Sequence, residues 1–162
     1  MGDHIETLEV DYDSQVVSFA DLLEVFWKSR RHDRPPYSRQ YKSAIFPHTQ
    51  EQSHIVQETQ KAYKKKYQVS YVEVIEKFTF YMAEDYHQKY WLQHTPFLLM
   101  LFYKVYKDDL MPTLFRSTVA ARVNGYIRGY GKFSQIQAEF PKFNWPQEKQ
   151  QEILAFLEKR DL

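Results

Sequence analysis

Histidine and cysteine content decides which chemistry this 162-residue chain could support on its own. Its six histidines are spread along the sequence, at His4, His32, His48, His54, His87 and His94. None belongs to an HExxH pair or to a dense group of carboxylates, so we expect no metal site. The chain contains no cysteine. Disulfides, thiolate metal sites and thiol nucleophiles are therefore excluded for these residues.

The stretch 78–91, FTFYMAEDYHQKYW, combines two periodicities. Phe78 and Phe80 occupy alternate positions, which is typical of the end of a half-buried strand. After an acidic pair that suits the first turn of a helix, aromatic residues recur at helical spacing, at Tyr86, Tyr90 and Trp91. The stretch predicts a strand that runs into a helix, with its aromatic side chains in the core.

The residues before position 95 alternate between strand and helix patterns. Strand patterns cover 5–12, 40–46 and 69–81, and helix patterns follow Ser18, cover 50–66 and begin after Ala83. Two of these helices open with capping-box pairs, which are Ser18 with Asp21 and Thr49 with Gln52. The alternation predicts helices layered on a sheet.

From Thr95 onward the pattern is helical only. We expect helices over 96–107, 110 to about 128, and 146–160. Three glycines in NGYIRGYG, at positions 125, 129 and 131, are expected to break the chain between the last two helices. No strand precedes them and no Lys-Ser or Lys-Thr step follows, so they do not form a phosphate-binding loop.

Composition excludes several classes of protein. The net charge is +1, which argues against a dedicated nucleic-acid binder. The longest apolar run, FLLMLFY at 97–103, has seven residues, whereas a membrane span needs about 20. The chain begins with polar and charged residues rather than a secretion signal. We therefore expect a soluble cytoplasmic protein.

Four segments carry a family resemblance. They are GDHIE at 2–6, SFADLLEVFW at 18–27, QYKSAIF at 40–46 and AEDYHQKY at 83–90. In this order they resemble the A-type methionine sulfoxide reductases, the peptide-methionine (S)-S-oxide reductase family. The resemblance implies an α+β fold with a mixed sheet flanked by helices. It places a partial reductase domain at 1–94 and an all-helical C-terminal extension at 95–162.

The resemblance also implies a chemistry. In this family a cysteine thiolate attacks the sulfoxide sulfur, a carboxylic acid protonates the oxygen, and tyrosine hydroxyls hold that oxygen. Glu6 matches the acid and Tyr41 matches one tyrosine. Methionine sulfoxide in proteins or peptides would be the substrate, and thioredoxin or another thiol would reduce a complete enzyme. Without the resemblance, Glu6 reads as an exposed strand carboxylate and Tyr41 as a core aromatic residue.

Two departures from the family weaken the implied activity. The Gly-Cys-Phe-Trp segment that supplies the nucleophile is missing from these residues, and no resolving cysteine is present. The loop between Trp27 and Gln40 is shorter than in typical members. The family's substrate-binding aspartate falls near Pro36, and Asp33 is its nearest approximation.

Two hypotheses follow. In the first, the chain is the later portion of a methionine sulfoxide reductase and is inactive as it stands, since no other side chain replaces the thiolate. In the second, it is a diverged non-enzymatic module that binds a protein partner. In that case the apolar helix at 97–103 and the rest of the tail would cover surface that the reductase sheet leaves open.

Overall fold

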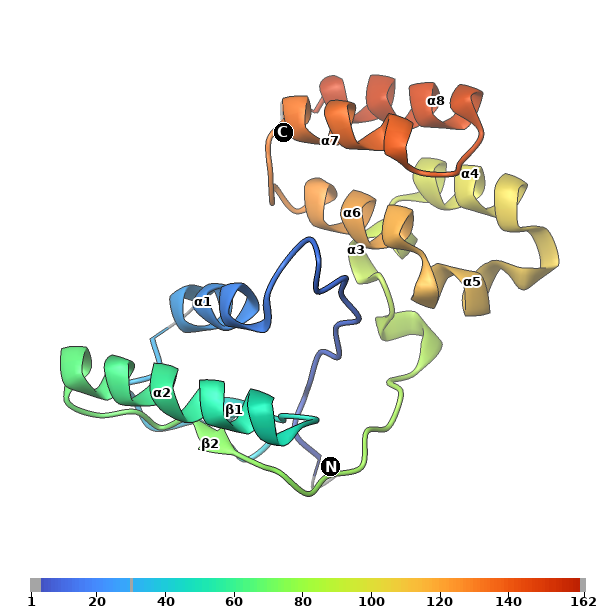
Figure 1. The fold of residues 1–162 in the computed structure, drawn as a ribbon. Coiled ribbons are helices and arrows are strands. Elements are labelled where there is room, and N and C mark those ends of the chain that lie inside the picture. The colour runs from blue at the N-terminus through green and yellow to red at the C-terminus, as the bar shows by residue number, and fades with distance from the viewer. Residues whose placement is uncertain (1–3, 30, 161–162) are drawn as a thin grey trace. The chain divides into compact units, whose positions relative to one another are not determined.

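The computed structural model describes residues 4–29 and 31–160, which fold into two compact units, Met1–Phe80 and Tyr81–Leu162 (Figure 1). The first unit contains α1 (Phe19–Ser29), β1 (Ala44–Ile45), α2 (Gln50–Tyr67) and β2 (Glu73–Val74). The second contains the single turns η1 (Asp85–His87), η2 (Lys107–Asp109) and η3 (Phe140–Lys142), together with α3 (Tyr90–Gln93), α4 (Pro96–Tyr106), α5 (Leu110–Arg116), α6 (Thr118–Ile127), α7 (Phe133–Glu139) and α8 (Gln147–Glu158). The α+β class is confirmed. The boundary expected at 94/95 stays a prediction about domains.

Both capping residues of the first unit begin helices where the sequence predicts them. Asp21 donates its backbone N–H to the Ser18 hydroxyl over 3.1 Å and accepts from the Ser18 backbone N–H over 3.0 Å, a reciprocal capping box. Thr49 accepts from the backbone N–H of Gln52, but the Gln52 side chain accepts from the backbone of His48 instead of Thr49. Both helices therefore start with satisfied donors.

The sheet of the described residues consists of β1 and β2 alone, which pair in parallel. Ala44 is opposite Glu73, and Ile45 is opposite Val74. Both strands are much shorter than the patterns at 40–46 and 69–81 predicted. A mixed sheet therefore stays a prediction, and the observed pair serves mainly to tie the residues before α2 to those after it.

The strand expected at 5–12 is wrong. These residues have no regular structure, and the side chains of Leu8 and Val10 are 83% and 50% exposed. The segment is linked to the rest of the unit through Glu6, whose backbone N–H donates to the Gln40 carbonyl over 3.0 Å. A period-two pattern identifies residues that could form a strand, but a strand also needs a partner along its length.

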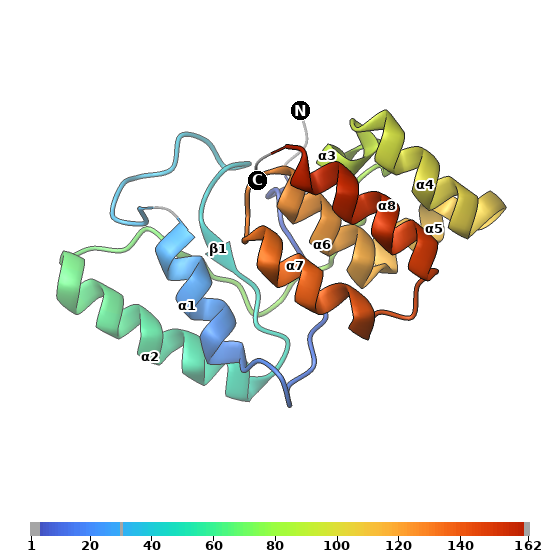
Figure 2. The same ribbon diagram turned by 90° about the horizontal axis from the view of Figure 1, so that it is seen from above.

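The core of the first unit is small. Among the described residues it consists of four buried side chains, Leu23, Ile45, Val56 and Val72. Helix α1 packs on α2 and closes one side of this core, as Figure 2 shows. Aromatic side chains from the end of α1 and from α2 extend it: Trp27 stacks on Tyr63 with ring centroids 4.8 Å apart.

The stretch 78–91 differs from its prediction. Residues 78–80 are not in a strand, and the expected helix is divided into η1 and α3. Lys89 lies between them with a φ of 48°, a left-handed conformation that ends one helical turn before the next begins. Tyr86, Tyr90 and Trp91 remain 40–59% exposed, so they are not core residues of the described chain.

The second unit has the larger core, with thirteen buried residues in its described part, contributed by α3 through α8 and by η3. Helix α4 confirms the prediction at 96–107 and buries Leu98, Leu101 and Phe102. The helix expected at 110–128 is interrupted at Ser117, which ends α5 and caps α6 by accepting from the Ala120 backbone over 3.0 Å. Helices α6, α7 and α8 follow and lie side by side (Figures 1 and 2).

One helix was missed and one glycine was misread. No helix was expected over α7, which occupies part of the interval between the last two predicted helices. Gly125 lies inside α6, whereas Gly129 and Gly131 have φ values of 83° and 106° and form the turn into α7. At Gly131 a Cβ atom would come within 2.5 Å of the Tyr126 ring, so a larger residue would clash.

Candidate active site

Glu6 and Gln40 join two segments that are far apart in the sequence. The Glu6 backbone N–H donates to the Gln40 carbonyl over 3.0 Å, and the Gln40 side-chain amide donates to Glu6 Oε1 over 2.8 Å. The Glu6 side chain is exposed, although the acid role expected of it rests on a buried, protonated carboxyl. The double link brings Glu6 next to the residue that precedes Tyr41.

Tyr41 follows directly after this link and just before β1. Its ring is 49% exposed, so it is not the core aromatic residue that its type alone suggests. Its backbone N–H contacts the Ser38 hydroxyl at 3.4 Å, within a loop that has no regular structure. A half-exposed phenol can donate to a ligand oxygen.

Asp33 forms an ion pair with Arg31. Arg31 donates to both of its carboxylate oxygens, with Nε 2.9 Å from Oδ1. These hydrogen bonds are the main cause that holds the pKa of Asp33 below its usual range, and they raise the pKa of Arg31. Asp33 is therefore an ionised acceptor near neutral pH and not a proton donor.

His32 is the polar residue that sequence reasoning missed. It is 1% exposed and stacks on Phe26 with ring centroids 4.5 Å apart. Its Nε2 lies 2.9 Å from the Phe26 carbonyl, which can only accept, so this nitrogen carries a hydrogen. In the neutral ring, Nδ1 then accepts from the Ser43 hydroxyl 3.0 Å away.

The His32 contacts fix the loop that carries the candidate residues. His32 follows α1, Ser43 immediately precedes β1, and the His32 backbone N–H donates to the Tyr63 hydroxyl of α2 over 3.0 Å. The loop of 31–42 is thus held at both ends, and Asp33 and Tyr41 lie near those ends. No spacing rule identifies such a histidine, because its partners come from three different elements.

The described residues contain no group of three or more side chains that could hold a metal ion. Glu6 and Tyr41 offer a carboxyl and a phenol, which can donate or accept hydrogen bonds and protons, but with no cysteine in the sequence these residues offer no thiolate. The arrangement can therefore assist a reaction at a polar oxygen without supplying the nucleophile.

Comparison with known protein families decides the lineage. The family model described as Peptide methionine sulfoxide reductase matches residues 1–113. The chain belongs to this family. The match contains the segments at 2–6, 18–27, 40–46 and 83–90 that carry the resemblance in the sequence, and it contains all three candidate residues.

Individual relatives extend the similarity. The chain is 38% identical over 144 residues to a Drosophila melanogaster peptide methionine sulfoxide reductase, covering 86% of this chain and 56% of the relative. It is 33% identical over 135 residues to the Arabidopsis thaliana peptide methionine sulfoxide reductase A5, covering 78% and 51%. A Methanosarcina acetivorans reductase is 38% identical over 96 residues, covering 54% and 50%.

Two facts follow from these coverages. The chain spans about half the length of the curated relatives it matches. The similarity to the Drosophila reductase covers a larger share of this chain than the range 1–113 does, so it continues into the helical tail.

In the described part of the chain, no helix is long and apolar enough to span a membrane.

Proposed function

We propose that these residues carry the supporting part of a methionine sulfoxide reductase site, with Glu6 as the acid that protonates the sulfoxide oxygen and Tyr41 as a donor to that oxygen. Asp33 is the proposed substrate-binding carboxylate. The observation that carries this proposal is the pair of hydrogen bonds between Glu6 and Gln40, which joins two family-matching segments.

The proposed reaction sets a clear requirement. A thiolate attacks the sulfoxide sulfur and forms an S–S bond, while the sulfoxide oxygen takes a proton from the carboxylic acid. The S–O and S–S bonds at the methionine sulfur then break, the thioether leaves, and a hydroxyl ends on the cysteine sulfur as a sulfenic acid, so that the cysteine is oxidised by two electrons and the sulfoxide is reduced by two. A second thiol then reduces the sulfenic acid and releases water. No atom of the 162 residues can take the first step. We therefore propose that the chain by itself does not reduce methionine sulfoxide, and that the nucleophile lies outside these residues.

The test is an activity assay on the purified 162-residue chain. A peptide containing methionine (S)-sulfoxide is incubated with dithiothreitol, and conversion to methionine is followed by mass spectrometry. We expect no conversion above the thiol-only reaction. Stereospecific turnover that is abolished in Glu6→Gln and retained in Glu9→Gln would overturn the proposed inactivity. Glu9 is a matched control because it is an exposed carboxylate of the same segment.

A non-enzymatic module that binds a protein partner is the second candidate. It is favoured by the apolar side chains that α4 leaves exposed, where Phe97, Met100 and Tyr103 are 39%, 45% and 56% accessible. The coding sequence upstream of Met1 separates the two candidates. An in-frame segment with a Gly-Cys-Phe-Trp motif favours the reductase, and an in-frame stop codon followed by a defined start favours the module.

The redox partner and the cellular compartment of the protein are also proposed. A complete reductase of this lineage would take electrons from thioredoxin or another thiol, which the resemblance implies. We propose the cytoplasm as the compartment, because neither the composition nor the longest apolar run of seven residues indicates a membrane protein. Fractionation of cells that express the tagged chain tests this location.

A further inference from the structure

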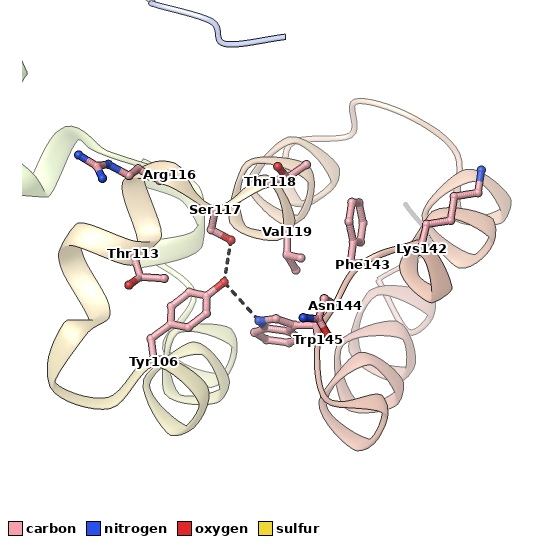
Figure 3. Close-up of a pocket in the computed structure, with 10 residues that line it drawn as sticks. All are labelled: Tyr106, Thr113, Arg116, Ser117, Thr118, Val119, Lys142, Phe143, Asn144 and Trp145. Carbon is pink, nitrogen blue, oxygen red and sulfur yellow. Dashed lines mark hydrogen bonds between the residues drawn. The ribbon is translucent and has the colours of Figure 1, made fainter. Parts of the chain in front are cut away.

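The second unit contains a groove that takes no part in the proposed reductase site. Its volume is about 370 Å³, within the range of small-molecule sites. Residues from α4, α5 and α6, the end of η3 and the segment between η3 and α8 line it, and Figure 3 shows their side chains. Its wall contains three aromatic side chains, two cations and no carboxylate.

The aromatic wall is held in place from behind. The ring of Trp145 packs on the fully buried Phe102 with centroids 4.7 Å apart, and Phe102 also contacts Tyr106 edge to face at 5.7 Å. The backbone of 143–145 is fixed by Gln150, which is 8% exposed and whose side-chain amide donates to the Trp145 carbonyl over 2.8 Å. A ligand would therefore meet a preformed surface.

The hydroxyls of Tyr106 and Ser117 leave one donor unused. Trp145 Nε1 donates to the Tyr106 oxygen over 3.2 Å, and the Ala120 backbone N–H donates to the Ser117 oxygen over 3.0 Å. The two oxygens lie 2.7 Å apart, so one hydroxyl hydrogen joins them. The other hydrogen has no acceptor among the described residues, whichever hydroxyl carries it. The pair can thus donate one hydrogen bond to a ligand.

The charges at the groove are of one sign. Arg116 and Lys142 stand at opposite margins of the groove, with their charged ends turned away from the Tyr106–Ser117 hydroxyl pair (Figure 3). Both are exposed, and neither has an ion-pair partner in the described part of the chain. Asp109 lies outside the lining and accepts from the hydroxyl of the lining residue Thr113 over 2.6 Å. An anion in the groove would meet hydroxyl donors and no lining carboxylate, with the two cations at its margins.

We propose that this groove binds a small ligand with a planar apolar body and an oxyanion group, either a carboxylate or a phosphate. The apolar body would pack on Trp145 and Phe143. The oxyanion would accept from the Tyr106–Ser117 hydroxyl pair, and the exposed Arg116 and Lys142 side chains would turn inward from the margins to approach it. The proposal does not depend on reductase activity, because the candidate catalytic residues lie in the first unit.

A second groove in the same unit supplies an internal comparison. It is similar in volume, about 390 Å³, and its lining has no charged residue: Gln93, Pro96, Leu99, Met100, Tyr103 and Leu110. A neutral aromatic molecule could enter either groove, but only the groove at Trp145 combines aromatic rings with cations. A preference for the anionic form of one aromatic body therefore distinguishes the two.

The test uses the full chain and the indole N–H resonance of Trp145 in nuclear magnetic resonance spectra, assigned with Trp145→Phe. Benzoate, phenyl phosphate, inorganic phosphate and benzyl alcohol are titrated separately at constant ionic strength. We expect saturable shifts with benzoate or phenyl phosphate, and the stronger of the two identifies the oxyanion. The double variant Arg116→Gln/Lys142→Gln should weaken that binding by about tenfold or more. Lys104→Gln/Lys159→Gln removes the same charge outside the groove and should retain it.

Three results would overturn the proposal. The first is the absence of a saturable shift with either aromatic anion up to about 10 mM, which is a weak limit for any specific site. The second is an affinity for benzyl alcohol equal to that for the aromatic anions. The third is an affinity for the anion that is unchanged in the Arg116/Lys142 double variant. Inorganic phosphate binding as tightly as phenyl phosphate would refute the role of the aromatic wall. Urea unfolding of each variant shows whether its fold is intact, and so separates lost binding from lost structure.

Discussion

The two units of this chain contain similar numbers of residues but bury very different cores. Among the described residues, the first unit, which holds Glu6, Asp33 and Tyr41, has a core of four buried apolar residues, and the second has a core of thirteen. The first unit contains three of the four segments that match the family, at 2–6, 18–27 and 40–46, whereas the second contains the one at 83–90 and extends beyond the range of the family model. The comparison teaches that the residues that identify a lineage need not be those that stabilise the chain.

The largest expected effect tests this difference directly. Phe102→Ala in the second unit should lower the free energy of unfolding by about 3–5 kcal/mol, because the side chain is fully buried and leaves a large cavity. Val56→Ala, at an equally buried position of the first unit, should cost about 2 kcal/mol. Hydrogen exchange of α4 and α2 amides, read separately for each unit, is the measurement.

Exposed positions provide the controls for this pair. Val25 in α1 and Met100 in α4 are 67% and 45% exposed, and their substitution by alanine should change stability by no more than about 0.5 kcal/mol. If Val56→Ala raises the exchange rates of the α2 amides as much as Phe102→Ala raises those of α4, the two cores do not differ in stability as their numbers of buried side chains indicate.

The same contrast explains what the sequence could predict. Local rules located the helix starts at Ser18 and Thr49 and the whole of α4, because capping and helical periodicity depend on neighbours within four residues. They failed at 5–12, where a period-two pattern had no pairing partner, and at Lys89, where a left-handed residue divides an otherwise helical pattern.

For the candidate site, the family resemblance supplied Glu6, Tyr41 and Asp33 as candidates but not their surroundings. The Arg31 contact of Asp33 is local and could have been suspected from the charges at 31 and 33. The exposure of Glu6 and the buried hydrogen bond between His32 and Ser43 could not have been predicted from the sequence, because both depend on how distant segments pack together. Residue type and spacing carry no information on such meetings.

A pair of tryptophans sharpens the comparison at a smaller scale. Trp27 Nε1 in the first unit is buried and has no hydrogen-bond partner among the described residues, whereas Trp145 Nε1 in the second donates to the Tyr106 hydroxyl. A buried donor without a partner costs about 1–3 kcal/mol. Trp27→Phe should therefore be less destabilising than Trp145→Phe, by about 1 kcal/mol in urea unfolding. An equal cost would indicate that Trp27 gains a partner in solution.

The smallest effect concerns pH and the start of α1. Hydrogen bonds from the Ser18 hydroxyl and backbone lower the pKa of Asp21. A carboxylate whose pKa is lower in the folded than in the unfolded chain stabilises the fold above its unfolded pKa, about 3.9, and that contribution is lost as the pH falls through the folded pKa. Asp21→Asn should therefore remove part of the acid sensitivity of α1, measured by hydrogen exchange of its amides between about pH 5 and 2. Asp11→Asn, at an exposed acid outside the helix, is the control and should leave the pH profile of α1 unchanged.

The loss of a cap should raise amide exchange in α1 more than in α6. The first unit has few buried side chains to offset a lost cap, whereas Ser117, the cap of α6, adjoins the larger core. A pH profile of α1 that is identical in Asp21→Asn and in the unmodified chain would show that the capping box contributes nothing to this difference.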